Sequence, residues 1–465
     1  MTRTLSRVQP VLTPAQMRHV DQNSGVSFDV LVARAGYAVA HAARLMMDGT
    51  YGRRVIVVAG KGNNGADGRV AAELLEQRGA RVTVFDAERT PIVLPQCDLV
   101  IDAAYGTGFR GDYSAPHTTA PVLAVDIPSG IDASTGEEHG RVLPADATVS
   151  FGALKPGLVL QPGRRLAGEV HVLDIGLAID RAVDVDSRLL GLVDADDVND
   201  WIPRRTHSAH KWNAGVRAIA GSKGMPGAAR LACAAAYRAG AGIVHLSGIG
   251  MSADHEAPTE VVYRALPDVR WATAALADID RFAAVLIGPG IGRGDELVDE
   301  FIDFVVRCPR PIVIDGDGLQ LLGTSRDGRH GDAAGVIARR PAPTVLTPHD
   351  GEFSSLVGHE PGSDRIAEVR DAAAHLGATV LLKGSATVIA DPSGDALLVA
   401  AGDERLATAG SGDVLTGVIA AYLARGATPL HAAAAGAFTH AAALRGLPDD
   451  GIVASDLISG LGWHD

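Results

Sequence analysis

Short runs of β-branched and apolar residues alternate with helical stretches along most of the chain, and this alternation constrains the fold more than any other feature. The expected strands are residues 54–59, 82–85, 99–101, 122–125, 216–220, 285–287, 312–314, 345–346 and 380–382. Such alternation is typical of parallel sheets with helices on both faces. In each half one strand leads into a glycine turn, at 60–68 and 221–227, and then into a helix, at 70–77 and up to Arg238. The pattern predicts an α/β protein with two doubly wound sheets.

The length of 465 residues allows several domains. Between residues 178 and 199 the chain is rich in aspartate, and Gly191 is the only glycine. We therefore place a linker near residues 180–205. The predicted domains are residues 1–195 and 200–465.

Composition narrows the class of protein. A net charge of −13 and an aromatic content of 4% argue against a nucleic-acid partner. Cys97, Cys233 and Cys308 lie far apart and match no metal-binding spacing, which favours a reducing compartment. The N-terminus has no apolar signal region, and the alanine-rich stretch 430–444 is predicted to be a buried helix rather than a membrane span. We expect a cytoplasmic protein without a membrane partner.

The first glycine turn has the GxGxxG spacing over residues 60–65, and Asp86 follows the next strand. Alone, this pattern would indicate NAD binding and a dehydrogenase. However, we see no acid/base pair for a second substrate. Asn63, Asn64 and Asp67 add carbonyl oxygens and a carboxylate, which suit ribose hydroxyls or a hard cation.

Two further polar clusters come at predicted strand ends. They are IDAAYGTG at 101–108 and VDIPSGID at 125–132. In open α/β sheets ligands bind outside these strand ends, so we expect the three loops to converge on one crevice. Asp126 could act there as an acid/base group or only anchor a ribose.

The strings GNNGADG, DAAYGTG and VDIPSGIDASTG resemble those of the YjeF N-terminal domain, the NAD(P)H-hydrate epimerase family. The resemblance implies a Rossmann-like domain in which Asp126 inverts the hydrated nicotinamide carbon. It implies a potassium ion held by Asn64, Asp102 and Ser129. Ala66 stands where the family usually has a glycine. The substrate contacts implied are Asn63, Asn64, Gly65, Ala66, Asp67, Gly106, Thr107, Gly108, Phe109, Arg110, Gly111, Asp112 and Asp126.

In the second half, the run ATAGSGDVLTG at 407–417 places small residues before Asp413 and an apolar helical stretch after it. Backbone N–H groups at such a turn and at the start of the helix form an anion site. Asp413 beside that site could accept a proton from a hydroxyl. The motif predicts phosphoryl transfer to an alcohol.

Three more clusters follow predicted strands: IGPGIG at 287–292, LTPHDGEF at 346–353 and LKGSAT at 382–387. Lys383 and the hydroxyls nearby suit phosphate oxygens. His349 could bind a substrate or cap the next helix.

These clusters resemble the ribokinase-like superfamily, and within it the YjeF C-terminal domain, the ADP/ATP-dependent NAD(P)H-hydrate dehydratase. The resemblance implies that Asp413 activates the hydroxyl added by hydration, that ADP, with ATP as the alternative, is the co-substrate, and that magnesium bridges its phosphates. Two segments depart from the family, at 210–213 and 314–318. The implied substrate contacts are Ala228, Gly290, His349 and Asp413; the implied nucleotide contacts are Lys383, Gly384, Ser385, Ala386, Thr387 and Gly412.

The order of the two halves matches the bifunctional form of the family, which restores NADH and NADPH from their hydrates and forms homo-oligomers. Two alternatives stay open. One is a kinase of the same superfamily acting on a vitamin-precursor alcohol. The other is a non-catalytic dinucleotide-binding scaffold, although such a protein would not need Asp126, Lys383 or Asp413.

Overall fold

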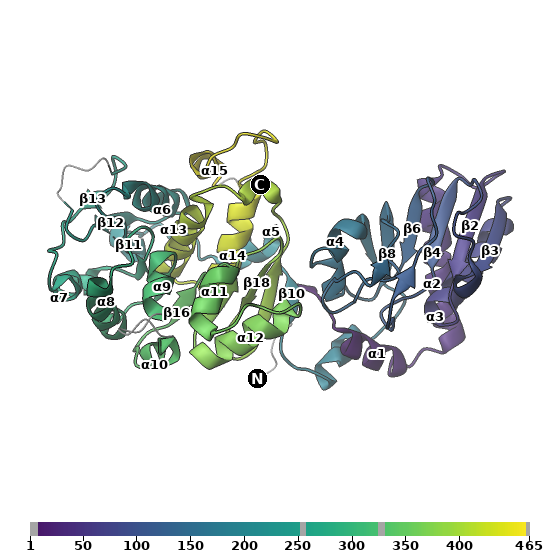
Figure 1. Ribbon diagram of the computed structural model, residues 1–465, viewed down its shortest axis with the longest axis horizontal. Helices are drawn as coiled ribbons and strands as arrows, with labels where there is room; N and C mark the ends of the chain where they lie inside the picture. The colour runs from purple at the N-terminus through teal and green to yellow at the C-terminus, as the bar shows by residue number, and fades with distance from the viewer. Residues whose placement is uncertain (1–7, 252–256, 324–330, 462–465) are drawn as a thin grey trace. The chain divides into compact units, whose positions relative to one another are not determined.

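The computed structural model describes residues 8–251, 257–323 and 331–461, and the chain divides into two compact units (Figure 1). The first unit spans Gln9–Arg188, and the second comprises Val8 and the chain from Leu189 onward. Within the stretch where a linker was expected, Leu190–Leu192 form strand β10 and Ala195–Trp201 form helix α5. Both elements belong to the second unit, so that stretch is not an irregular linker throughout.

The first unit contains a parallel sheet in the order β3-β2-β4-β6-β8-β9. Every residue of β4, β6 and β8 is buried, as expected for central strands of a parallel sheet. One face packs against α2 and α3, while loop residues such as Leu94 and Leu143 cover the other. The elements are α1 Pro14–Gln22, α2 Phe28–Met46, β2 Arg54–Ala59, α3 Asn63–Glu76, β3 Arg81–Asp86, β4 Leu99–Ala103, β5 Tyr113–Ser114, β6 Val122–Val125, β7 Gly140–Arg141, β8 Ala147–Phe151, α4 Gly163–Leu166 and β9 Glu169–Leu173.

Helix α3 begins at Asn63, earlier than the sequence predicted, and Gly62 is its N-cap residue. The reason is the close approach of this turn to the neighbouring strand end. A Cβ atom on Gly60 would lie 1.9 Å from the Ala104 carbonyl oxygen, and one on Gly65 would lie 1.9 Å from the Gly60 carbonyl oxygen. Glycine at both positions therefore lets the first turn of the helix pack directly against the end of the sheet.

The sheet of the second unit runs in the order β10-β19-β18-β17-β16-β15-β14-β11-β12-β13. Its pairings are parallel except at β18, which is antiparallel to both neighbours. The strands are β11 Gly215–Ile219, β12 Ile243–Ser247, β13 Val262–Tyr263, β14 Ala284–Ile287, β15 Ile312–Ile314, β16 Thr344–Leu346, β17 Thr379–Leu382, β18 Thr387–Ala390 and β19 Ala396–Val399. The helices after α5 are α6 Pro226–Arg238, α7 Trp271–Leu276, α8 Asp295–Arg307, α9 Asp317–Gly323, α10 Ala333–Ala338, α11 Asp350–Val357, α12 Arg365–Leu376, α13 Ser411–Ala424, α14 Pro429–Ala442 and α15 Ala454–Gly460.

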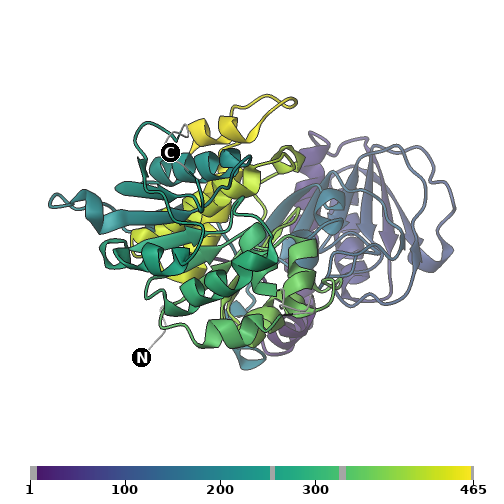
Figure 2. The same cartoon turned by 60° about the vertical axis from the view of Figure 1, so that its left-hand side comes forward.

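Helices α13 and α14, drawn in yellow-green and yellow in Figure 2, lie in the core of this unit. All residues of α13 from Val414 onward are buried. The alanine-rich stretch forms α14, which confirms the prediction of a buried helix. A Cβ atom on Gly417 would lie 2.1 Å from the Ala232 carbonyl oxygen of α6, so a glycine lets α13 touch the backbone of its neighbour. None of the described helices combines the length and apolar character needed to span a membrane.

Candidate active sites

A cavity of about 1090 Å³ lies in the first unit, where β2, β4 and β6 end. The three loops that the sequence predicted to converge all contribute to it. Gly65, Ala66, Gly111 and Asp112 are not among the residues that line it. Ala66 is instead an ordinary helical position of α3, where a methyl group is well tolerated. The predicted substrate contacts that do line the cavity are Asn63, Asn64, Asp67, Gly106, Thr107, Gly108, Phe109, Arg110 and Asp126.

Asp126 follows β6 with a left-handed backbone (φ 67°), which costs energy in a residue other than glycine and occurs most often at functional sites. Its Oδ1 atom accepts a 2.5 Å hydrogen bond from the Lys155 Nζ atom. Lys155 is 1% exposed and also donates to the Ser150 hydroxyl at 2.9 Å and to the Phe151 carbonyl at 3.0 Å. All three ammonium protons are thus used. Asp126 is therefore one half of a buried ion pair at the cavity wall.

Two more carboxyl groups, those of Asp67 and Asp21, line the same cavity. Burial, and then the charges of Asp126 and Asp21, raise the pKa of Asp67 to about 8. Burial and the charge of Asp126 raise the pKa of Asp21 to about 6. Near neutral pH the cavity therefore holds a protonated carboxyl group close to an ionised one.

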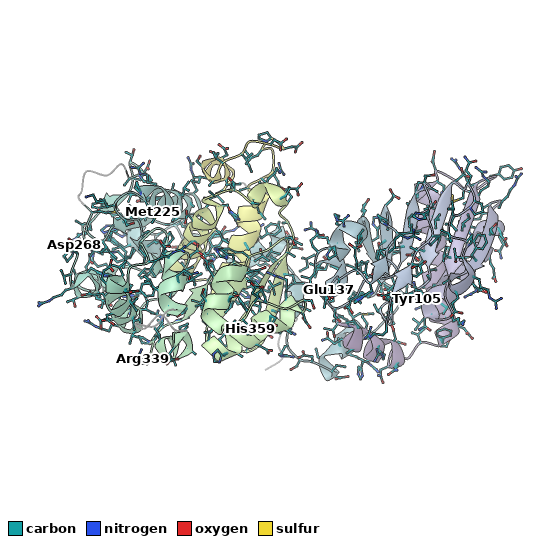
Figure 3. The ribbon with its side chains drawn as sticks, viewed as in Figure 1. Tyr105, Glu137, Met225, Asp268, Arg339 and His359 are labelled. Atoms are coloured by element: carbon teal, nitrogen blue, oxygen red, sulfur yellow. The ribbon has the colours of Figure 1, made fainter. Side chains whose placement is uncertain are left out.

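The three predicted potassium ligands lie around the backbone of Tyr105, which is labelled in Figure 3. The Asn64 amide donates to the Tyr105 carbonyl at 3.0 Å, and the Ser129 hydroxyl oxygen lies 3.1 Å from the same carbonyl oxygen. The Asp102 carboxylate accepts from the Ser129 hydroxyl at 2.6 Å and from the Ser129 amide at 2.9 Å. Burial raises the pKa of Asp102. The structure thus brings these side chains together in a cluster rich in oxygen atoms.

Gly106 lies between two of the predicted site residues. A Cβ atom there would lie 3.4 Å from the Asn64 Oδ1 atom and 3.4 Å from the Asp126 Oδ2 atom. Absence of a side chain at this position keeps open the space in front of both polar groups.

In the second unit, Asp413 stands in the first turn of α13, after Gly410 with φ 92°. The backbone amides of Gly412 and Asp413 have no backbone acceptor within the described part of the chain, as is usual at a helix start. Burial and the neighbouring Asp315 are the main causes that raise the pKa of Asp413 to about 7. A titratable carboxyl group therefore stands beside free N–H donors.

Asp315, at the end of β15, binds two residues of this site. Its Oδ1 atom accepts from the Lys383 Nζ atom at 2.6 Å, and its Oδ2 atom accepts from the Thr416 hydroxyl at 2.5 Å. A Cβ atom on Gly412 would lie 3.3 Å from the Lys383 Nζ atom, so the ammonium group is next to the first turn of α13. The lysine is thereby held at the anion site.

Of the predicted nucleotide-binding segment, residues 383–386 form the hairpin loop between β17 and β18, and Thr387 is the first residue of β18. Gly384 and Ser385 are exposed, whereas Ala386 is buried, so that residue offers only its backbone. Arg365 of α12 donates to the Lys383 carbonyl at 3.1 Å and pairs with Asp350 at 2.7 Å. These contacts connect the backbone of the loop to α11 and α12.

His349 caps α11: its Nδ1 atom accepts from the Gly351 and Glu352 amides at 3.1 and 3.2 Å. Its Nε2 atom lies 3.5 Å from the buried Glu352 carboxyl, and the side chain is 61% exposed. The histidine thus serves as a cap and still presents a ring edge to solvent.

Ala228 and Gly290 come together, since a Cβ atom on Gly290 would lie 3.3 Å from the Ala228 Cβ atom. It would also lie 3.1 Å from the carbonyl of Met225, the residue before α6 that is labelled in Figure 3. Next to this pair, Asp317 accepts from the Gly292 amide at 3.0 Å and from Arg293 at 2.5 Å, which orders the glycine turn after β14.

Comparison with known proteins decides the family. The NAD(P)H-hydrate dehydratase model matches residues 216–459, and the YjeF-related protein N-terminus model matches residues 28–92 and 85–157. The bifunctional NAD(P)H-hydrate repair enzyme Nnr of Mycobacterium leprae is 38% identical over 446 residues, covering 89% of this chain and 88% of the relative. The chain belongs to this family of bifunctional repair enzymes.

Two further matches concern the family and the fold. The Nnr enzyme of Moorella thermoacetica is 35% identical over 500 residues, covering 93% of this chain and 91% of its own. A ribokinase-like superfamily protein from Enterococcus faecalis V583 matches the fold with a TM-score of 0.50 and 22% identity, covering 58% of this chain and 94% of its own. The expected ribokinase-like fold of the second unit is thus confirmed.

Several polar residues at the two sites of this bifunctional chain were not predicted from the sequence. Lys155, Asp315 and Thr416 are buried or partly buried partners of predicted site residues, and Asp21 lines the cavity from α1. Lys155 stands alone in the apolar sequence FGALKPG, and Asp315 directly follows a predicted strand. A lysine is rarely buried unless it has a charged partner. The position of Lys155 in an apolar stretch could therefore have indicated a buried ion pair.

Proposed function

We propose that the chain is a bifunctional repair enzyme for hydrated NADH and NADPH. The first unit interconverts the R and S epimers, and the second unit dehydrates the S epimer at the expense of ADP. The observation that carries the proposal is Asp413, a carboxyl group of raised pKa set at a helix start beside Lys383. This is the arrangement that phosphoryl transfer to a hydroxyl requires.

In the dehydration step, Asp413 takes the proton from the hydroxyl that hydration added to the ring. The oxygen then attacks the terminal phosphoryl group of ADP, and AMP leaves. Amides at the start of α13 and the Lys383 ammonium stabilise the phosphoryl oxygens. The carbon–oxygen bond next breaks, phosphate departs, and loss of a ring proton restores the double bond of the dihydronicotinamide.

In the epimerisation step, the substrate occupies the cavity of the first unit, and its hydroxyl-bearing carbon lies near Asp126. Hydration creates two epimers, and a stereospecific dehydratase uses only one of them. The fused epimerase supplies that epimer from the other. This division explains why both activities belong in one chain.

Two ions belong to this proposal. Asn64, Asp102, Ser129 and the Tyr105 carbonyl offer one carboxylate and neutral oxygens, a donor set that fits a monovalent hard cation such as potassium. In the second unit, the described residues contain no group of three or more His, Cys, Asp or Glu side chains that could hold a metal ion by themselves, so magnesium would take most of its ligands from the nucleotide phosphates and water. Magnesium would supply charge neutralisation for the nucleotide phosphates.

A homo-oligomer in the cytoplasm completes the proposal. The reduced thiols favour that compartment: Cys97 is partly buried, and Cys233 and Cys308 are buried, all as free thiols. Light scattering of the purified protein measures the oligomeric state.

The test is a turnover assay with the purified full-length chain, hydrated NADH and either ADP or ATP. We expect the near-ultraviolet absorbance of dihydronicotinamide to return, with one AMP and one phosphate released per ring when ADP is used. Accumulation of a stable phosphate ester of another alcohol would favour the kinase alternative. Binding of the hydrate without any turnover would favour a scaffold.

A further inference from the structure

Asp67 is a buried carboxyl group at the epimerase cavity that has no partner of its own. It stands on the second turn of α3, is 7% exposed and lines the cavity together with Asp126. No hydrogen bond or ion pair of its carboxyl group is found in residues 8–251, 257–323 and 331–461. A buried carboxyl group without a partner is costly as an anion, so the fold keeps a proton there.

The chemistry of epimerisation asks for two proton-transfer groups. Protonation of the ring enamine places the added hydroxyl on the carbon next to the ring nitrogen. Inverting that carbon means that oxygen leaves from one face and returns on the other. One carboxyl group reaches only one face, so an acid and a base on different sides are needed.

The other charged groups of the cavity suit this role less well. Asp86 and Glu88 are exposed and paired with Arg69 and Lys61. The Lys155 ammonium group donates its three hydrogen bonds to Asp126, Ser150 and Phe151. Asp21 has a pKa of about 6 and is mainly ionised at neutral pH.

We propose, on the basis of the epimerase function above, that Asp67 is the general acid of epimerisation and works against Asp126 as the base. The Asp67 carboxyl group gives its proton to the leaving hydroxyl, and the carbon–oxygen bond breaks with its electron pair on the departing water. The ring nitrogen lone pair forms a carbon–nitrogen double bond. A water molecule then adds from the opposite face, the double-bond electrons return to nitrogen, and Asp126 takes the extra proton. Proton exchange with solvent water then returns a proton to Asp67 and removes one from Asp126 before the next turnover, and in the reverse reaction the two roles are exchanged.

The surroundings of Asp67 support this division of labour. Asp126, after β6, and Asp21, on α1, both disfavour its charge, and Lys155 instead neutralises Asp126. Arg18, Lys61, Arg89 and Arg110 are the other cations lining the cavity. An acid with a pKa of about 8 thus stands in the same cavity as a carboxyl group that is paired with a buried lysine.

The test uses the full-length chain with Asp67→Asn, and with Glu73→Gln as the matched control, since Glu73 is an exposed carboxylate on the same helix. Purified R epimer with ADP reports epimerisation, and purified S epimer with ADP reports dehydration. We expect Asp67→Asn to lower the kcat of R-epimer conversion by about 100-fold or more with little change in KM. S-epimer turnover should stay at the wild-type rate in both variants. Wild-type kcat/KM for the R epimer should fall above about pH 8.

Three results would overturn the assignment. The first is turnover of the R epimer by Asp67→Asn at nearly the wild-type rate. The second is an Asp67→Asn variant in which only the KM for the R epimer increases. The third is an S epimer that carries no label after the wild-type reaction in water labelled with heavy oxygen. The last result would mean that the carbon–oxygen bond never breaks. If the wild-type chain itself fails to convert the R epimer, the epimerase function falls, and the role of Asp67 falls with it. If wild type converts the R epimer and Asp67→Asn does too, only the role of Asp67 is refuted.

Discussion

At the scale of single residues, the two sites share one electrostatic arrangement. Each site pairs a lysine with an aspartate at a strand end, Lys155 with Asp126 and Lys383 with Asp315. Each keeps another carboxyl group outside the pair, Asp67 or Asp413, with a pKa of about 8 or about 7. This additional carboxyl group can therefore exchange protons near neutral pH.

Replacing Asp413 by asparagine should separate activity from stability. We expect loss of S-epimer dehydration by about 100-fold or more, because the hydroxyl has lost its base. The folded pKa of Asp413 lies above the ordinary value, so the wild-type protein loses stability as the pH rises from about 4 to about 7. Above pH 7 the variant should unfold at a higher denaturant concentration than wild type, and its free energy of unfolding should be larger by roughly 1–2 kcal/mol. A variant that keeps its dehydratase activity would contradict this role. So would a variant that is less stable than wild type by the same free energy at every pH.

The pH profile of dehydration follows from the same residue. A base must be ionised to accept a proton, so kcat/KM for the S epimer should rise about tenfold per pH unit below about pH 7 and level off above it. Initial rates with saturating ADP across this range give the measurement. A rate that falls as the pH rises toward 7 would assign Asp413 to the opposite proton transfer.

Lys155 gives a stability prediction in the first unit. Lys155→Met leaves Asp126 without its cation, which should cost about 3–5 kcal/mol as for other buried pairs broken on one side. The double variant Lys155→Met with Asp126→Asn removes both charges and should recover most of that loss without regaining epimerisation. Chemical denaturation followed by circular dichroism measures both. Equal stability of the single and double variants would mean that the pair is not coupled.

Residues that carry a motif were predictable, whereas their partners were not. Asp126 and Asp413 stand in glycine-rich strings that are recognisable from the sequence. Lys155 and Asp315 are 29 and 68 positions from the residues that they bind, and no local spacing predicts such a contact. Charge pairs of this kind depend on which strands become neighbours in the sheet, and that order is a property of the whole fold.

At the scale of elements, α13 is held in place by contact between backbones. Gly417→Ala would place a methyl carbon 2.1 Å from the Ala232 carbonyl oxygen, so α13 and α6 would have to separate. We expect a loss of about 3 kcal/mol or more in stability and weaker nucleotide binding, because the start of α13 would move too. Gly227→Ala on α6, where a Cβ atom meets open space, is the control for stability. Thermal unfolding of both variants provides the comparison, and equal unfolding temperatures would contradict the prediction.

Nine strands were predicted within a few residues, because they form short apolar runs: β2, β3, β4, β6, β11, β14, β15, β16 and β17. Strands β8, β9, β12 and β19, the start of α3 and the antiparallel strand β18 are among the elements that were not predicted. Asn63 to Asp67 contain turn-forming residues that local preference assigns to a loop, yet close packing against Ala104 makes them helical. Thr387 was expected only as a nucleotide contact, whereas it begins β18, which pairs antiparallel with β17 in a hairpin whose loop holds most of the proposed nucleotide contacts.

At the scale of the whole molecule, each of the two proposed activities draws its residues from one unit. The epimerase residues lie between Gln9 and Arg188, and the dehydratase residues lie after Leu189. Damage to one site should therefore change one kinetic quantity and leave the other. Residues of the second unit determine the rate of dehydration, whereas residues of the first unit determine how much of an epimer mixture can be repaired.

This separation can be measured with Asp126→Asn and a mixture of both epimers. The variant should restore dihydronicotinamide at the wild-type initial rate, because the S epimer is already present and the residues around Asp413 are unchanged. Recovery should then stop when the S epimer is exhausted, apart from slow uncatalysed conversion, whereas wild type continues to completion. Adding the Asp413→Asn variant, whose first unit is intact, should restore full recovery, since epimers diffuse freely between chains. If Asp126→Asn lowers the initial rate on pure S epimer, or if the mixture of the two variants fails to go to completion, the two activities are not independent.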